Sequence, residues 1–401
     1  MKTIGSIRII LYILIAILGS VYISTAGDKV NWPDEKIYIE IATNLNKGQG
    51  YVNELSEPSA FRPPGYPFLI SILYKAKSAP LIAKIANLIF LILTTYILEK
   101  IIRFTSPSGA IFTPLAIFAY PLFIYASGIL IPQIFGSFLF ILSIYCIFIA
   151  KRNYWNGIFC GIIIGFLALT IPTFFLFYLI LLLILIAKNP NKKKSIYILL
   201  VFLFMNITIA PWIIRNSLLF NSTVFISTNS GINLLYSNSE NTQYDSGTID
   251  ISKHTSPVKL NEAQEDEYYK KIVFNLISEN PTRYIKLYFL RTLNYFNYKN
   301  NISNQSEVNS LKNLVLFFSY YPFLIIAILR ISFFQKIKLS YIEYYFYLIY
   351  FGNALLSAIF FTRIRYRIPF DFILIAISCI AIGRYLDFQN SKNDKSMSYT
   401  L

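Results

Sequence analysis

Two adjacent carboxylates and an arginine stand in the first polar stretch of the chain, and these residue types can move a proton and hold an anion. Asp34 and Glu35 lie in "NWPDEKIYIEIATNL", and Arg62 opens the turn "RPPGYP", which also contains Tyr66. A carboxylate can serve as a general base, and an arginine can bind phosphate oxygens through parallel N–H donors. The spacing therefore predicts proton transfer next to an anionic group.

A short amphipathic helix is predicted to carry the two carboxylates. Pro33 suits the first turn of a helix, and Asp34 and Glu35 then complement the helix dipole. Tyr38 and Ala42 follow Asp34 at four-residue spacing and share its face. An acidic first turn is also an ordinary helix cap, so this pattern alone leaves the roles of both carboxylates open.

A second apolar-faced helix is expected after the "RPPGYP" turn, from Pro67 to Tyr74. Two surface helices joined by a rigid bend would form a cavity rim at the membrane boundary. They would hold the carboxylate pair near Arg62. Opposite charges at a hydrocarbon boundary favour a substrate with a phosphate head and an apolar tail.

Composition identifies the chain as an all-α, multi-pass membrane protein. Of its 401 residues, 55% are hydrophobic and only 14% are charged, whereas a soluble domain has about 25% charged residues. The net charge of +16 is attributed to the orientation of membrane helices, and no nucleic-acid partner is expected. The three cysteines lie in apolar runs and His254 in a polar stretch, so no metal site and no cofactor are predicted.

About ten membrane spans are predicted from apolar runs of sufficient length. They are 8–25, 80–99, 109–127, 129–150, 155–170, 172–187, 195–213, 311–330, 341–361 and 368–386. Lysine and arginine clusters follow every second span, which places both termini in the cytoplasm. We therefore expect one membrane domain, 1–401, in the cell (inner or plasma) membrane, with two polar segments outside. We call 26–79 the first polar segment and 214–310 the second polar segment.

Three arginines close together run against this orientation signal. Arg363, Arg365 and Arg367 lie in the short segment between the last two predicted spans, on the expected outer side. Positively charged flanks usually lie inside, so binding of an anionic headgroup is the simplest reason to retain them. Arg215 is a weaker candidate, because it can simply anchor the end of the 195–213 span.

The second polar segment is too long for a simple turn. Helical periodicity runs through 261–296 and is broken at Asn280 and Pro281, which predicts two helices. We expect this segment to cap the cavity and to help select the acceptor.

Three motifs in this order resemble the glycosyltransferase C superfamily, and in particular its family-39 group. That group holds protein O-mannosyltransferases and the aminoarabinose transferases of lipid A. The motifs are Asp34-Glu35 followed by "GQGY" and "RPPGYP", then "PWIIRNSLLF" at 211–220, and "RIRYRIPFDF" at 363–372. They frame nearly the whole chain.

This resemblance implies transfer of a sugar from a polyprenyl-phosphate carrier to a hydroxyl group of a cell-surface lipid, glycan or protein. Asp34 matches the base, with Glu35 as an assistant or a helix cap. Partial desolvation is expected to raise the pKa of the base. The donor and its lipid phosphate are assigned to one tyrosine and five arginines: Tyr66, Arg62, Arg215, Arg363, Arg365 and Arg367.

One position departs from the family pattern. Gln133 stands where an acidic residue is expected near the start of a span, which indicates a changed acceptor or reduced activity. The alternatives are a polymerase or ligase of O-antigen type, a transporter of lipid-linked sugars, and a non-catalytic membrane protein. The pair of surface helices directly after the first span disfavours the polymerase or ligase. A transporter should place ionisable residues at mid-membrane depth, and few stand out there.

Overall fold

The computed structural model describes residues 2–74, 79–187, 191–245, 250–300, 310–332 and 337–398, and parts of both polar segments lie outside this description. The described part is helical, without a named strand. In chain order the helices are α1 (Lys2–Ala26), α2 (Pro33–Asn46), α3 (Gly65–Leu73), α4 (Ala79–Thr105), α5 (Pro107–Ala110), α6 (Thr113–Phe118), α7 (Leu122–Ser127), α8 (Gln133–Phe148), α9 (Tyr154–Ala168), α10 (Thr173–Ala187), α11 (Lys192–Phe220), α12 (Ser230–Asn238), η1 (Ser252–His254), α13 (Glu262–Glu279), α14 (Pro281–Asn294), α15 (Ser310–Ser332), α16 (Tyr341–Ser357) and α17 (Ile364–Ser398).

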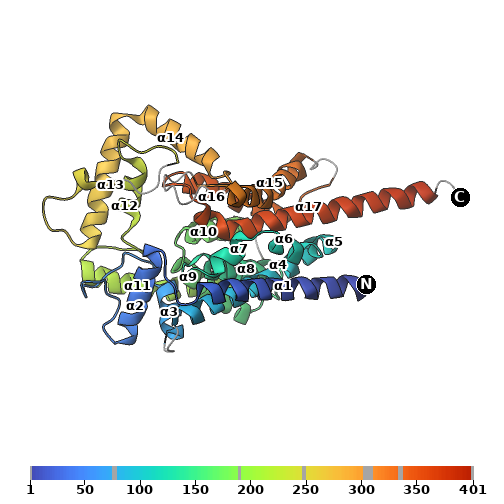
Figure 1. Ribbon diagram of the computed structural model, residues 1–401, viewed down its shortest axis with the longest axis horizontal. Coiled ribbons are helices and arrows are strands. Elements are labelled where there is room, and N and C mark those ends of the chain that lie inside the picture. Colours follow the sequence, from blue (N-terminus) through green and yellow to red (C-terminus); the bar gives the residue numbers. More distant parts are fainter. Residues whose placement is uncertain are drawn as a thin grey trace.

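The two polar segments gather at one end of an elongated molecule. Helices α1 and α17 run along its length and bring both termini to the opposite end (Figure 1). We call these the loop end, with α2, α12 and α13, and the terminus end. The two ends match the two sides that the sequence predicts, and which of them faces outward stays a prediction.

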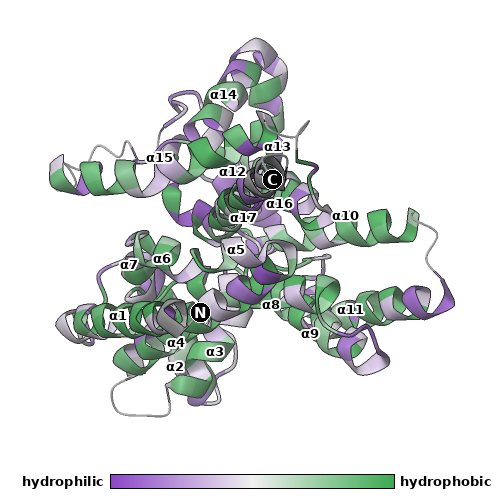
Figure 2. Cartoon of the chain, turned by 90° about the vertical axis from the view of Figure 1, so that its right-hand side faces the viewer, coloured by the Kyte–Doolittle hydropathy of each residue, from purple (hydrophilic) through white to green (hydrophobic). Residues whose placement is uncertain are grey.

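In the part of the chain that the structure describes, five helices are long and apolar enough to cross a membrane. They are α1, α4, α11, α15 and α17, and α17 is the most enclosed, with 89% of its apolar window buried. Helices α8, α9 and α10 are apolar but shorter. Figure 2 shows helices such as α9 and α10 mostly in green, the colour of hydrophobic residues. The chain is therefore an all-α, multi-pass membrane protein, while the number of about ten spans stays a prediction.

The predicted span 109–127 is not one continuous helix. Three short helices, α5, α6 and α7, replace it, and a proline stands within one residue of the start of each: Pro107, Pro114 and Pro121. Proline lacks the N–H donor that a helix interior needs and suits a first turn. Each proline therefore starts a new helix and prevents the preceding one from continuing.

Helices form in the polar segments where the sequence predicts them, and their place at the membrane surface stays a prediction. Helix α2 starts at Pro33 with Asp34 and Glu35 in its first turn, and it buries Tyr38 and Ala42. Helices α13 and α14 meet at Asn280, whose side chain caps α14. Local signals suffice here, because proline at a first turn and asparagine at a cap act within a few residues.

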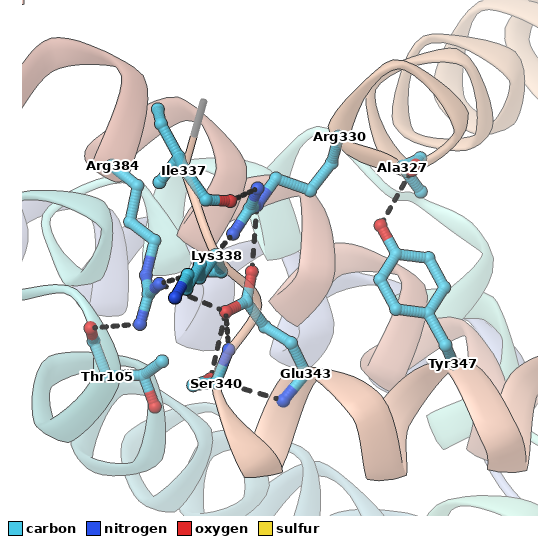
Figure 3. Close-up of polar contacts among 9 residues, drawn as sticks. All are labelled: Thr105, Ala327, Arg330, Ile337, Lys338, Ser340, Glu343, Tyr347 and Arg384. Atoms are coloured by element: carbon cyan, nitrogen blue, oxygen red, sulfur yellow. Dashed lines mark hydrogen bonds and ion pairs between the residues drawn. The ribbon is translucent and has the colours of Figure 1, made fainter. Parts of the chain in front are cut away.

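A buried clamp holds the helices together at the terminus end (Figure 3). Glu343 is fully buried on α16 and pairs with Arg330 of α15, Oε1 to Nε, at 2.9 Å. Its other oxygen accepts the backbone N–H of Ser340 at 2.7 Å and lies 3.4 Å from Nη1 of Arg384 on α17. The remaining Arg330 donors reach the carbonyl oxygens of Ile337 and Lys338. The clamp thus joins α15, α16 and α17, and each N–H donor named here has a carboxylate or carbonyl oxygen as its partner.

Candidate active site

Glu35 fixes the start of α2 and so sets the position of Asp34. Its Oε2 accepts the backbone N–H groups of Asn31 (3.0 Å) and Trp32 (2.9 Å). Its Oε1 accepts the N–H of Leu130, 95 residues away, at 2.8 Å. Both oxygens of this buried carboxylate are therefore occupied. Of the two roles left open for Glu35, the geometry favours the cap.

Asp34 lies between two arginines that come from opposite parts of the chain. Its Oδ1 is 2.5 Å from Nη2 of Arg62, and its Oδ2 is 2.5 Å from Nη1 of Arg365. The side chain of Asp34 is 19% exposed, so the pairs are sheltered but reachable. Three of the predicted site residues thus meet at the loop end.

The Arg62 turn is held in place by the hydroxyl of Tyr51 and by the backbone of Leu169. Tyr51 donates its hydroxyl hydrogen to the carbonyl oxygen of Arg62 at 2.7 Å. Gly65, three residues on, donates its N–H to the carbonyl of Leu169 at 2.8 Å. A Cβ on Gly65 would lie 2.3 Å from the Thr170 hydroxyl oxygen, so this close approach requires glycine.

Arg363 adds a third positive charge to this group. It acts on Asp34 electrostatically, and its guanidinium lies over the ring of Phe361 at 5.1 Å. The Nε atoms of Arg62, Arg363 and Arg365 are all buried, and within the described residues none has a hydrogen-bond partner. We call Asp34, Arg62, Arg363 and Arg365 the loop-end cluster. The cluster contains three cations and one anion, and its three Nε donors are unpaired within the described residues.

The charge balance of the cluster reverses the expected pKa shift of Asp34. Burial alone would raise the pKa of this carboxyl, but the Arg365 and Arg62 guanidinium groups outweigh burial and hold the pKa below its ordinary value. The expectation of a raised pKa is therefore wrong for Asp34 as it lies between these arginines. Asp34 is ionised at neutral pH and stabilised as the anion.

Two tyrosines that the sequence did not mark as site residues complete the cluster. The Arg62 guanidinium lies over the ring of Tyr38, and its carbon is 5.8 Å from the ring centroid. The hydroxyl oxygen of Tyr366 accepts a hydrogen bond from Nη2 of Arg365 at 2.7 Å. The signals were present, since Tyr38 shares the helix face of Asp34 and Tyr366 lies inside "RIRYRIPFDF".

Tyr66 lies beneath the cluster. It is almost completely buried, and its ring meets Tyr38 edge-on at 5.4 Å. Its hydroxyl oxygen accepts a hydrogen bond from the Asn87 side chain at 3.1 Å. Tyr66 therefore supports Tyr38, and its assignment to donor binding stays a prediction.

Arg215 lies apart from the cluster, where it fastens the first polar segment to α11. Its Nη1 donates to the carbonyl of Ser59 at 2.7 Å and its Nη2 to the carbonyl of Tyr51 at 2.8 Å. Its guanidinium also stacks over Trp212 at 4.7 Å. These contacts match the anchoring role considered for Arg215 from sequence.

Arg367 points into the protein rather than toward Asp34. It is 2% exposed and pairs with Asp371, Nε to Oδ1, at 3.0 Å. Its Nη1 donates to the carbonyl oxygens of Tyr295 and Asn297, each at 2.8 Å, and its guanidinium lies 3.6 Å from the ring centroid of Tyr320. Arg367 thus fastens the start of α17 to the end of the second polar segment.

A cavity of about 320 Å³ opens beside the cluster. Arg62 lines it, together with Phe61 and with Glu40 and Glu54. Glu262 at the start of α13 lines it as well, and its Oε2 accepts the N–H of Ala60 at 2.7 Å. The second polar segment therefore contributes a wall to a cavity that the first polar segment opens.

Gln133 is the first residue of α8 and is 7% exposed. Its side-chain oxygen is buried without a hydrogen-bond partner in the described structure. Across the same described residues, no group of three or more His, Cys, Asp or Glu side chains lies together as a metal site would require.

Comparison with known proteins gave matches among solved structures alone. No family model and no curated protein matches the sequence. One similar structure is that of ArnT from Cupriavidus metallidurans bound to undecaprenyl phosphate, with 13% sequence identity, a TM-score of 0.45, and coverage of 92% of this chain and 75% of that chain. The same ArnT in the apo state has 13% identity, a TM-score of 0.45, and coverage of 94% and 76%.

Proposed function

We propose that this protein is a membrane glycosyltransferase that moves a sugar from a polyprenyl-phosphate carrier to an acceptor hydroxyl, with its active site on the outer face. The observation that carries the proposal is the loop-end cluster, in which one ionised carboxylate lies among three arginines whose buried Nε donors have no partner in the described part of the chain. This arrangement fits the base and anion site that the three glycosyltransferase C motifs imply.

Donor binding would change the state of Asp34. A phosphate that takes up the free donors of Arg62, Arg363 and Arg365 competes with Asp34 for the same positive charges. The carboxylate then loses part of its stabilisation, while its burial, which favours the neutral form, remains. The bound donor would thus raise the pKa of Asp34 and make it a stronger base.

The reaction then balances at named atoms. Asp34 accepts the proton of the acceptor hydroxyl, and the acceptor oxygen bonds to the anomeric carbon. The bond from that carbon to the phosphate oxygen breaks, and the phosphate leaves with the electron pair. The guanidinium groups stabilise the added negative charge, since arginine remains protonated. The 320 Å³ cavity beside Arg62 is the proposed acceptor site.

The test is a transfer assay on purified protein in lipid nanodiscs. A panel of polyprenyl-phosphate pentoses and hexoses is supplied with lipid, oligosaccharide and peptide acceptors, and sugar release is followed by mass spectrometry. Asp34→Asn should lower turnover about a thousandfold, within the usual range for a general base, and should still bind polyprenyl phosphate. The matched control is Asp28→Asn, because Asp28 lies in the same segment but accepts the N–H of Leu81. Full turnover by Asp34→Asn would exclude this residue as the base.

One observation favours the alternative of a lipid-linked-sugar transporter. The Arg367–Asp371 pair is buried within α17, and buried ionisable groups in spans often serve transport. A transporter would move the donor lipid between leaflets of proteoliposomes without breaking the bond to its sugar. Movement of the donor lipid between leaflets, with no sugar transferred to any acceptor of the panel, would favour that alternative.

A further inference from the structure

Helix α14 presents an apolar stripe that no described part of the chain covers. Ile285, Phe289 and Leu293 are 59%, 64% and 69% exposed. Their four-residue spacing places them on one face, while the opposite face buries Tyr284 and Leu287. A contiguous exposed apolar face of this kind marks a contact with a partner or with lipid.

The position of α14 indicates what covers the stripe. Arg283 near its start donates to the carbonyl of Glu240 in the second polar segment at 2.6 Å. At its other end Asn294 donates to the hydroxyl of Thr362 at 2.9 Å, next to α17. Helix α14 therefore slopes from the loop end toward the ends of the membrane helices (Figure 1).

Exposed apolar side chains lie at and just beyond the end of α16, where α14 contacts it. Tyr288 of α14 donates its hydroxyl hydrogen to the carbonyl of Leu355 at the end of α16 at 3.0 Å. Leu355 is 50% exposed and Ile359 is 43% exposed. Exposed apolar surface on a multi-pass membrane protein marks contact with lipid, so lipid against Leu355 and Ile359 would also reach the stripe.

Positive charge flanks the stripe on one side. Arg283 and Lys286 line a cavity of about 230 Å³, together with Leu287 and Leu290. Arg291 follows on the buried face and is 1% exposed. In the described structure none of these three cations has a carboxylate partner within ion-pair distance.

Arg291 is a buried cation without a counter-ion. Its Nη1 donates to the side-chain oxygen of Asn238 at 3.1 Å, while its Nε and Nη2 are buried without partners in the described structure. Burial, aided by the charge of Arg283, lowers the pKa of Arg291 to about 10, so it stays charged at neutral pH. An unpaired buried charge is unfavourable, and an anion held near it would offset that cost.

We propose that α14 lies in the leaflet at the loop end and binds an anionic membrane lipid. The lipid phosphate occupies the cavity beside Arg283 and Lys286, and the acyl chains lie along Ile285, Phe289 and Leu293. Lys286 and Leu293 are separated by about 10 Å along the helix axis, which suits a headgroup above and chains below. A helix with one cationic and one apolar face is the usual form of an interfacial helix. The proposal is independent of the glycosyl transfer.

The depth of α14 can be measured with a spin label. The native cysteines are all buried, so a label on Phe289→Cys is selective, and Lys271→Cys on the exposed side of α13 is the control. In phosphatidylglycerol-containing nanodiscs, the label at 289 should be more accessible to oxygen than to a water-soluble nickel chelate. The label at 271 should show the opposite. Equal nickel accessibility at both positions would overturn the proposal.

The headgroup site can be tested by lipid binding. Binding of phosphatidylglycerol to the purified protein is measured by native mass spectrometry, and Lys286→Gln should weaken it about fivefold, as one cation near a lipid phosphate contributes. Lys271→Gln should leave binding unchanged. An unchanged affinity in Lys286→Gln would refute the site. So would full displacement of the lipid by millimolar inorganic phosphate, which would indicate a site for soluble anions.

Discussion

Glu343 and Asp34 are carboxylates at opposite ends of the molecule, and each pairs with two arginines. At the terminus end Glu343 is fully buried, and the donors of Arg330 are shared between this carboxylate and two carbonyl oxygens. At the loop end Asp34 is 19% exposed, and the buried Nε donors of its partners Arg62 and Arg365 have no acceptor among the described residues. The Arg330 donors in the first arrangement are paired, whereas the second arrangement has N–H donors that could bind an anion.

A structural ion pair and a binding site differ in whether all their hydrogen-bond donors and acceptors are paired. A buried pair that satisfies all its atoms joins helices and has no capacity for a ligand. A cluster with surplus cations and unused donors is unfavourable in isolation and gains from a bound anion. Mutations should therefore affect mainly stability at the terminus end and mainly ligand binding and transfer at the loop end.

Glu343→Gln should produce the largest loss of stability. It leaves the buried Arg330 without its carboxylate, which costs about 3–5 kcal/mol for a buried pair. Thermal and chemical denaturation in detergent would measure the change, with the exposed Glu57→Gln as the control. A variant as stable as the wild type would contradict the structural role of the clamp.

Polyprenyl phosphate should stabilise the protein through the loop-end cluster. At a hundredfold excess over its Kd, a ligand that binds the folded state adds about 2.7 kcal/mol. Denaturation with and without the lipid would show the gain. Arg365→Gln should lose most of it, whereas Arg384→Gln, which removes a cation of the clamp, should retain it. Equal gains in both variants would place the lipid phosphate elsewhere.

The smallest effect concerns pH. Because the pKa of Asp34 lies below its ordinary value of 3.8, its contribution to stability is present above that value. The contribution is lost as pH falls through the lower pKa of the folded state. Near pH 6 the free energy of unfolding of the wild type should exceed that of Asp34→Asn by on the order of 1 kcal/mol. The difference should narrow below about pH 4, and Tm measured across this range for both proteins checks it. A constant difference would mean that Asp34 is not ion-paired in solution.

Sequence alone determined those features that depend on near neighbours. Pro33 and Pro281 each begin a helix, and the break at Asn280 separates α13 from α14, because caps and prolines act within one turn. The apolar runs likewise predicted a multi-pass helical protein. The arginine-rich motifs also indicated two of the residues that meet Asp34.

Tertiary structure alone decided which arginines meet Asp34 and which serve as anchors. Arg365 reaches Asp34 across 331 residues, whereas Arg367, two residues later, faces Asp371 and Tyr295. The direction of the Asp34 pKa shift also followed from this arrangement. The physical reason is that the partner of a charged side chain, and hence its energy, is set by atoms that only folding brings near.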